Sequence, residues 1–419
     1  MTHLRSAALV AALASATLPD LSPPSAALRS APSTFVRRAT TDRPAALESA
    51  QERGPTPATP EQIRAAIDRL ADLDYPTRMA AGRTLRRAPA AQVVPALLQA
   101  VSEHADGFVR FRALILLTGF ADPRTEDAME TAMASPNDRL REVAYAYFEQ
   151  HPQPSLAAKL LAAIDKEDGE FVRPALVRAL AALPKDAKAA EVLVRDAMRG
   201  VDYFRSTVIE AIGDYRIAAA VSRLTEIAQI DGPLQDDAAI ALGKMGDKTA
   251  LGTLAALQQS APKETQPAIA AAICLLGTNC SAHIGYLHKT LTFAETYPGY
   301  QDLVRGAAAG LGHIAQKGND EALRILFDVG IPSQDPVRAP VTLAVGLVAL
   351  RNTPLLLKTL EARKDQDGAA GIVAEAFDML EEDLEEERFF VAVRKAYWSA
   401  PDGSPTRKLC ELLINKLDF

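Results

Sequence analysis

The stretch Phe108-Val109-Arg110, which opens an apolar run, decides the fold because it returns in altered form about every 32 residues. Each copy has an aromatic residue, an aspartate or a leucine near its start and an arginine before an apolar helix. The other copies are Tyr75-Pro76-Thr77-Arg78, Asp138-Arg139-Leu140-Arg141, Phe171-Val172-Arg173, Tyr203-Phe204-Arg205, Leu303-Val304-Arg305 and Asp335-Pro336-Val337-Arg338. Self-similarity at this period predicts a solenoid, an array of stacked repeats.

Around each copy the pattern is helix, turn, helix. Apolar residues recur at helical spacing, turns carry Gly, Pro, Asn or Asp, and no segment alternates as a half-buried strand does. The first helix is expected at Thr59-Pro60-Glu61-Gln62, where Thr59 and Gln62 form a capping box. The period predicts about ten to eleven antiparallel helix pairs over residues 59–419.

Composition suits such an array. The chain is 48% hydrophobic and only 5% aromatic, and alanine-rich helices pack closely. The net charge is −7, and residues 61–419 hold 40 basic against 49 acidic side chains. An acidic body is a poor electrostatic partner for nucleic acid, so no nucleic-acid partner is expected.

The N-terminus differs from the rest of the chain. Residues 1–18 join a basic start, an apolar run and a small-x-small site at Ala14-Ser15-Ala16, a pattern typical of a signal peptide. We therefore expect export to a periplasm or the extracellular space, the alternative being an Ala-rich leader on a cytoplasmic protein. Residues 19–58 are rich in Pro, Ser and Ala and predict a disordered linker. No integral membrane segment is expected in the mature chain.

The sequence resembles HEAT repeats, in particular the short bacterial type also found in phycobilisome-lyase-like proteins. The residues that carry the resemblance are Leu234 to Asp247, with paired alanines, Ala241-Leu242-Gly243 and a Gly-Asp exit, and a second copy from Arg305 to Gly312. The resemblance implies an all-α HEAT-repeat solenoid, a right-handed superhelix whose second helices line the concave face.

In the HEAT family the recurring Asp and Arg form ladders between repeats, in which Asp caps a second helix and Arg reaches carbonyls or Asp of a neighbour. Asp138 with Arg141 and Asp335 with Arg338 fit this pattern, whereas the other copies lack the Asp. We interpret the arginines as structural repeat positions, since a residue repeated in every unit serves stacking. They are Arg78, Arg110, Arg141, Arg173, Arg205, Arg305 and Arg338.

HEAT-type enzymes carry sequence features that this chain lacks. Proteins resembling deoxyhypusine hydroxylase hold two irons with His-Glu pairs, but no histidine here precedes a glutamate, and His283 and His288 lack metal-ligand spacing. HEAT-like DNA glycosylases use a basic, aromatic face, which this acidic chain with one tryptophan does not offer. Trp398, beside Tyr397, is interpreted as a packing anchor. No metal and no cofactor are expected.

Three cysteines are too few for a disulfide framework. Cys274 and Cys280 lie six residues apart across a predicted turn, which allows either a disulfide in an oxidising compartment or two small buried residues. Cys410 lies on an apolar helix face and is expected in the core.

Two further segments depart from the repeat. Arg305 follows the equivalent Ala268 by 37 residues, so an insertion around residues 296–300 predicts irregular stacking, and Tyr297 and Tyr300 are candidate binding residues. The acidic run 381–387 is interpreted as a solvated helix start, with docking of a basic partner or a cation as the alternative.

The sequence thus predicts a non-catalytic scaffold or adaptor that presents a concave helical surface to a protein partner. The alternative is a HEAT-like enzyme of the bilin-lyase class.

Overall fold

The computed structural model describes residues 56–295, 299–380 and 383–419. The expected leader, most of the expected linker and Tyr297 lie outside these residues. The chain divides into two compact units, Met1–Ser49 and Ala50–Phe419, and only the second is considered below.

This unit is all α-helical over the described residues and contains 22 α-helices in eleven pairs. The first helices of the pairs are α1 (Pro60–Asp68), α3 (Ala90–Glu103), α5 (Arg124–Ala132), α7 (Ala157–Ile164), α9 (Ala187–Asp196), α11 (Val221–Ala228), α13 (Leu251–Ser260), α15 (Cys280–Glu295), α17 (Asp320–Gly330), α19 (Thr353–Glu361) and α21 (Asp383–Ser399). The second helices are α2 (Tyr75–Arg87), α4 (Gly107–Thr118), α6 (Asp138–Gln150), α8 (Val172–Ala182), α10 (Asp202–Asp214), α12 (Gln235–Met245), α14 (Gln266–Leu275), α16 (Gln301–Gln316), α18 (Arg338–Arg351), α20 (Gln366–Leu380) and α22 (Pro405–Leu417).

Local sequence explains where the helices begin. The capping box at Thr59 is confirmed. The Thr59 hydroxyl accepts from the backbone N–H of Gln62, and the side-chain oxygen of Gln62 accepts from the backbone N–H of Thr59. Asp74 and Asp106 cap α2 and α4, their side chains accepting from the backbone N–H groups of Thr77 and Phe108. At α6 the capping side chain belongs to Asn137, one residue before the aspartate that the repeat pattern indicated. An N-cap of this kind contributes about 1 kcal/mol.

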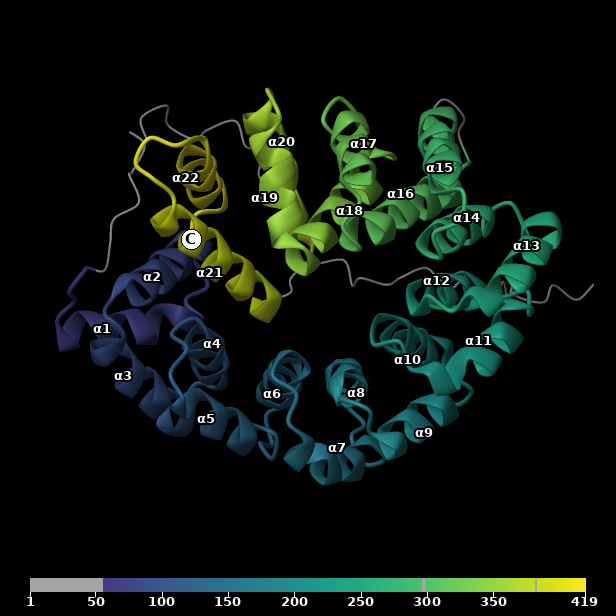
Figure 1. Ribbon diagram of the computed structural model, residues 1–419. Coiled ribbons are helices and arrows are strands. Elements are labelled where there is room, and N and C mark those ends of the chain that lie inside the picture. Colours follow the sequence, from purple (N-terminus) through teal and green to yellow (C-terminus); the bar gives the residue numbers. More distant parts are fainter. Residues whose placement is uncertain (1–55, 296–298, 381–382) are drawn as a thin grey trace, which may run out of the picture. The chain divides into compact units, whose positions relative to one another are not determined.

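Successive second helices pack directly on one another, with the first helices outside them except α21 (Figure 1). The closest approach uses the small residues of the repeat motif. A Cβ added at Gly243 of α12 would lie 2.6 Å from the Cα of Ala272 in α14, and one at Gly213 of α10 would lie 2.7 Å from the Cα of Ala241. Glycine is therefore required there to let the helix backbones meet.

Buried apolar residues form two clusters. One runs from Ile63 to Leu276, and the other runs mainly from Ala268 to Phe419. The change from one cluster to the other falls on α12 and α14, just before the predicted insertion. Leu384 of α21 belongs to the first cluster although it lies near the end of the chain.

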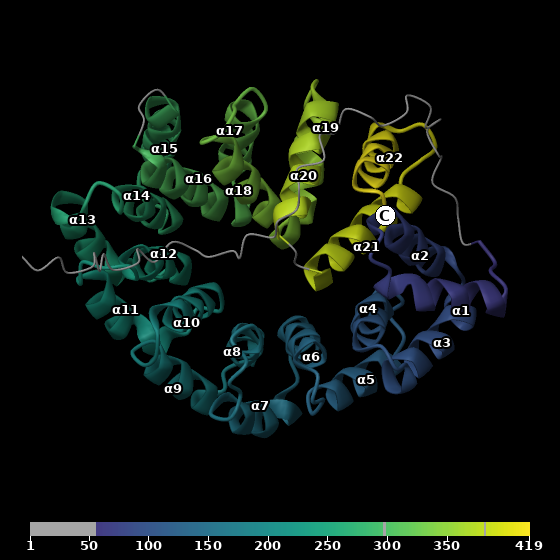
Figure 2. The same ribbon diagram turned by 180° about the vertical axis from the view of Figure 1, so that it is seen from behind.

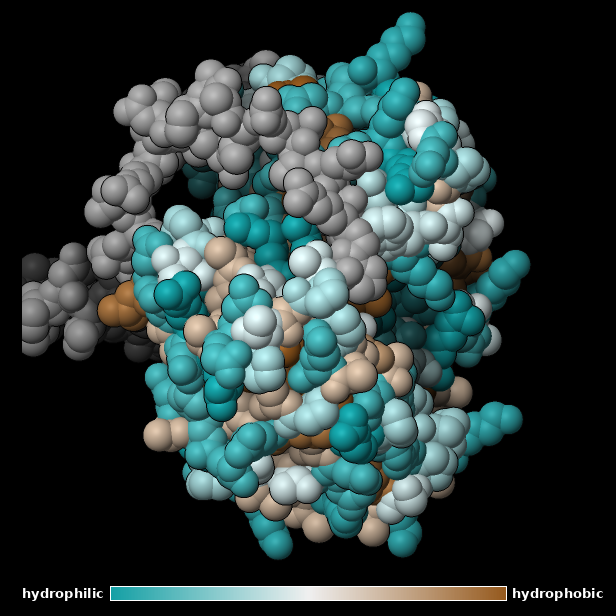
Figure 3. Space-filling view, turned by 90° about the vertical axis from the view of Figure 1, so that its left-hand side faces the viewer, coloured by the Kyte–Doolittle hydropathy of each residue, from teal (hydrophilic) through white to brown (hydrophobic). Residues whose placement is uncertain are grey.

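The last helices pack against the first repeats. Helix α21 contacts α4 and α6, and Arg83 of α2 pairs with Asp418 at the end of α22 (Figures 1 and 2). The second unit therefore closes on itself instead of ending in two separate caps. On the face that Figure 3 shows, hydrophilic and hydrophobic side chains alternate in small patches.

Within the described ranges no single helix is long and apolar enough to cross a membrane. Helices α18 and α19 meet the length and composition only when counted together, across a bend of 115°.

Candidate functional site

Four of the recurring arginines fasten a second helix to the turn before it. Each donates to a carbonyl oxygen at or just beyond the end of the preceding first helix. These bonds join Arg78 to Asp72 (2.7 Å), Arg141 to Ser135 (2.9 Å), Arg205 to Ala197 (3.0 Å) and Arg338 to Gly330 (3.0 Å). Carbonyls at a helix end lack partners inside the helix, so a guanidinium is a suitable donor for them.

Some of these arginines also reach the next repeat. Arg141 binds Glu167 at 2.8 Å, and Arg338 binds Glu375 at 2.7 Å. The guanidinium of Arg173 lies 3.7 Å from the ring centre of Phe204, a cation–π contact. The family resemblance implied that these arginines bind Asp of a neighbouring repeat. In this chain they contact Glu or Phe of the neighbouring repeat instead.

Arg305 is the exception among the repeated arginines. Its side chain is more than half exposed, and its ion pair is with Asp302 on the same helix. The expectation that it joins the ladder is therefore wrong.

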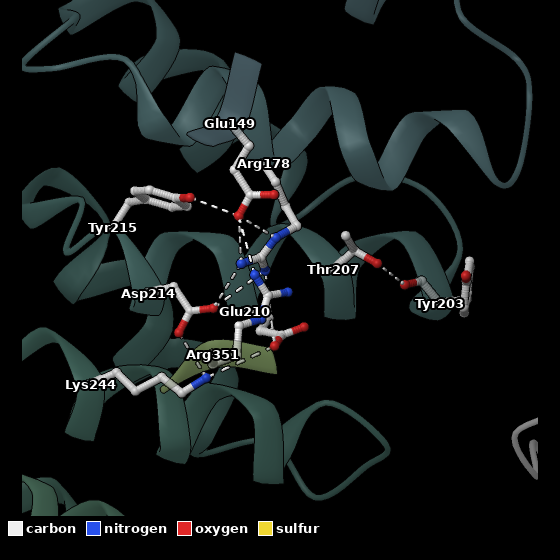
Figure 4. Close-up of polar contacts among 9 residues, drawn as sticks. All are labelled: Glu149, Arg178, Tyr203, Thr207, Glu210, Asp214, Tyr215, Lys244 and Arg351. Carbon is white, nitrogen blue, oxygen red and sulfur yellow. Dashed lines mark hydrogen bonds and ion pairs between the residues drawn. The ribbon is translucent and has the colours of Figure 1, made fainter. Parts of the chain in front are cut away.

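The inner helices carry a network of charged residues (Figure 4). Glu149 near the end of α6 accepts from Arg178 of α8 at 2.9 Å and from the Tyr215 hydroxyl at 2.7 Å. Asp214 at the end of α10 binds Arg178 at 3.3 Å and Lys244 of α12 at 2.9 Å. The network therefore ties four successive second helices together.

Arg351 extends this network across the inner surface. It lies at the end of α18, and its guanidinium is 3.5 Å from the carboxylate of Glu149 on α6. The side chains of Glu149 and Lys244 are only 2% exposed. Burying such charges is tolerated because each has an opposite charge and hydrogen bonds, and removing one partner from a buried pair typically costs about 3–5 kcal/mol.

Electrostatics fix the protonation of this network. Burial raises the pKa of Asp214, but Lys244 and Arg178 outweigh burial and hold that pKa near 2. Burial likewise opposes ionisation of Glu149, and Arg178 and Arg351 outweigh it, so the pKa of Glu149 is lowered. Burial and the charge of Lys244 lower the pKa of His313 to about 3. These groups hold one protonation state at neutral pH, which suits a structural clamp better than proton transfer.

Four exposed apolar residues lie away from this network, at or just after the turns between first and second helices. The exposed fractions are 71% for Phe171 and Val201, 60% for Ile230 and 51% for Tyr203. These turns precede α8, α10 and α12, which pack side by side. We call the four residues the loop edge. Tyr203 lies at the end of α10 remote from the ion-pair network (Figure 4).

The first position of the repeated phrase differs from the arginine position in its exposure. In most copies the arginine is partly or largely buried against its turn, whereas Tyr75, Phe171 and Tyr203 at the start of their copies point an apolar ring to solvent. Single exposed apolar residues are ordinary, but several gathered on adjacent repeats indicate an interaction surface.

The predicted binding residue Tyr300 lies at the start of α16 and is 39% exposed. Its ring meets Phe293 of α15 edge to face at 5.9 Å, and Phe293 and Tyr286 are also exposed. Tyr297 lies outside the described residues. The role of both tyrosines in binding stays a prediction.

The cysteines lie as follows. The structure joins Cys274 and Cys280 by a disulfide across the turn between α14 and α15. Cys410 is fully buried in α22, which confirms the prediction that it belongs to the core. His283 is half-buried and His288 exposed on α15. The described residues contain no group of three or more His, Cys, Asp or Glu side chains that could hold a metal ion.

One interpretation from sequence is wrong. Residues 381 and 382 of the acidic run lie outside the described residues. Residues 383–387 are not a solvated helix start, because Glu387 is 2% exposed and binds Arg86 of α2 through both its oxygens. The basic partner of this run is thus inside the same chain. Trp398 is 43% exposed and its neighbour Tyr397 is buried, and the guanidinium of Arg407 in α22 lies 4.5 Å from the Tyr397 ring centre and 5.6 Å from that of Trp398.

The residues of the inner network were not predicted from the sequence. A signal was nevertheless present, because most of them are charges in the last turn of an otherwise apolar second helix. Examples are Glu149, Asp214, Lys244 and Arg351. A charge at one place in several repeats points to a common surface, as the repeated arginines do.

Comparisons with known proteins agree with this fold. Residues 63–149 match the family model of HEAT repeats. Among curated proteins no sequence matches the chain. Two solved structures of importin-β are similar at 13% identity, one of them from yeast.

The first importin-β match covers 85% of this chain and 58% of the other, with a TM-score of 0.35. The yeast match covers 86% and 52%, with a TM-score of 0.29. The chain thus spans little more than half the length of these proteins, and at such scores the likeness supports no statement about activity. The family match over residues 63–149 and the eleven stacked helix pairs show that the chain has the fold of an all-α HEAT-repeat solenoid.

Proposed function

We propose that this protein is a non-catalytic scaffold that binds a protein partner, and that the loop edge is part of the contact surface. The observation that carries the proposal is the exposure of Phe171, Val201, Tyr203 and Ile230 on three adjacent repeats. Removing such side chains from water is the main favourable contribution in most protein association.

A partner cannot reach the whole of the expected concave surface in this chain. Its middle is occupied where Arg351 of α18 meets Glu149 of α6, so an extended partner running along every inner helix would have to break a buried ion pair. The loop edge requires no such rearrangement. This difference favours the edge as the place where a partner docks first.

The charges around the loop edge indicate the chemistry of the partner. The same turns carry exposed Asp168, Glu170, Asp202 and Asp231 against exposed Lys166 and Arg199. A partner segment with apolar side chains flanked by Lys or Arg is the complement of this surface. No specific observation on the described residues favours the bilin-lyase alternative, so we carry only the scaffold forward.

The test is capture of partners by the tagged full chain, followed by mass spectrometry. We expect the double variant Phe171→Ser/Tyr203→Ser to lose the partners that the wild type captures while keeping its elution volume on a sizing column. The comparison variant is Tyr297→Ala/Tyr300→Ala. Loss only in this second variant would move the surface to the loop before α16, and unchanged capture by both would overturn the loop-edge proposal.

A further inference from the structure

The seam where the first and last repeats meet contains a small cleft of about 200 Å³. One wall is the end of α4, with Leu116 and Phe120, and the other is α21, with Val391, Lys395 and Trp398. Its two walls are therefore nearly 300 residues apart in sequence. None of these residues belongs to the loop edge or to the inner network.

Helical spacing explains why α21 lines the cleft. Glu387, Val391, Lys395 and Trp398 follow one another at steps of four, four and three residues, which places them on one helix face. Glu387 at the start of this face is buried against Arg86. Further along, the face opens to solvent, since Val391 is 37% and Trp398 43% exposed.

The cleft is basic in an otherwise acidic protein. Arg86, Arg394 and Lys395 line it against the single carboxylate of Glu387, whereas the whole chain carries a net charge of −7. Arg86 is neutralised by Glu387, and Arg394 also donates to the Arg86 carbonyl at 3.3 Å. Lys395 is exposed and takes part in none of the ion pairs found among the described residues. An anionic group is the electrostatic complement.

The volume of the cleft limits the kind of ligand that it can bind. Sites for whole small molecules usually measure about 300–1,000 Å³, so this cleft is too small for one but has room for an apolar side chain. We propose that the seam cleft binds an acidic peptide segment of a partner protein, with one apolar side chain between Phe120 and Trp398 and a flanking carboxylate on Lys395. This site is additional to the loop edge and prefers the opposite charge.

The position of the cleft couples binding to closure of the array. A peptide held between α4 and α21 contacts both ends of the solenoid, so it binds the closed form and adds to the stability of that form. The acidic peptide is thus a ligand that favours the closed array, whereas a loop-edge partner binds one stretch of repeats.

Trp398 provides a direct assay, because it is the only tryptophan in the chain. The full chain is titrated with a capped hexapeptide in which a central leucine is flanked by glutamates, and tryptophan emission and heat of binding are recorded. We expect a saturable change in emission. Lys395→Glu should weaken binding by about tenfold or more, since it opposes like charges. The matched control is Lys289→Glu, an exposed lysine on α15, which should bind as the wild type does.

Two comparison peptides decide the outcome. A peptide with lysines in place of the glutamates, or with glycine in place of the leucine, should bind at least about tenfold more weakly. Equal binding of all three peptides, or absence of both heat and emission change with the acidic one, would overturn the proposal. The Phe171→Ser/Tyr203→Ser variant should bind the acidic peptide normally, so failure here and failure of the loop edge are distinguishable.

Discussion

Glu142 of α6 is the carboxyl whose environment opposes its charge most clearly. Burial raises its pKa to about 7; Arg139 works against this shift, while Asp383 and Glu385 of α21 reinforce it. The unfolded chain ionises this group near pH 4.5, its ordinary pKa. Between about pH 4.5 and 7 the unfolded state therefore releases a proton that the folded state keeps, and the free energy of unfolding falls as pH rises.

Replacing Glu142 by Gln should remove this dependence. We expect Glu142→Gln to raise the free energy of unfolding by about 1 kcal/mol at pH 8, after allowance for solvent screening of a partly exposed group, with no gain at pH 4. Urea unfolding at the two pH values measures it. Glu191→Gln, at an exposed site on α9, is the control. An equal gain at both pH values would mean that the amide acts by packing and not by charge.

The cysteines give a second prediction at this scale. If the chain is exported, oxidation should keep Cys274 and Cys280 joined as the structure has them, and leave only Cys410 as a thiol. Alkylation of the denatured protein should then label one cysteine before reduction and three after it. Three labelled cysteines without reduction would show that the pair is reduced in the cell.

Single residues differ in how far sequence predicts their role. The Thr59 capping box was predictable because both partners lie within three residues of each other. Glu387 was misread because its partner, Arg86, lies 301 positions away. Local pattern carries no record of such a contact, so an acidic run looks the same whether it faces water or a buried arginine.

At the scale of the helix, the small residues of the HEAT motif set how closely neighbouring repeats approach. Because a Cβ at Gly243 would lie 2.6 Å from the Cα of Ala272, the obstacle is backbone and not a mobile side chain. We expect Gly243→Ala to lower the free energy of unfolding by about 1–3 kcal/mol, the cost of overpacking. The shift of the urea midpoint measures it.

The matched control is Gly371→Ala in α20, where an added Cβ meets nothing within 4 Å. Alanine is the better helix former, so this change should raise the free energy of unfolding by about 0.5–1 kcal/mol. Opposite signs for the two substitutions would support close packing as the role of Gly243. If both substitutions changed the free energy of unfolding in the same direction, helix propensity alone would explain the effect at Gly243.

The helices themselves were predictable from sequence, since apolar spacing, caps and the repeat period all act within one repeat. The repeat period does not predict which repeats far apart in sequence contact each other. Helix α21 reads as the first helix of another pair, yet it packs on α4 and α6. Likewise, Arg305 follows the insertion before α16 and does not make the contacts that Arg338 makes at the same position of its repeat.

At the scale of the whole unit, this closure changes how stability is distributed. In an open array each repeat contacts only its neighbours, and the ends can fray independently. Here Leu384 shares a core with the first repeats, and Arg112 of α4 lies 3.7 Å from Asp383. We therefore expect the terminal repeats to unfold together, with protection from hydrogen exchange at α2 and α21 rising and falling in parallel.

The Arg86–Glu387 pair is the contact on which closure most depends, because it is bidentate, 2.6 Å at its shortest and nearly inaccessible to water. Glu387→Gln leaves the buried guanidinium without an opposite charge, at a typical cost of about 3–5 kcal/mol. Separating the ends exposes the guanidinium to water, so we expect the variant to open and its radius of gyration to increase in small-angle X-ray scattering. Glu61→Gln breaks the exposed pair with Arg64, which solvent screens, and should leave the radius unchanged. A Glu387→Gln protein as compact as the wild type would show that apolar contacts alone hold the seam.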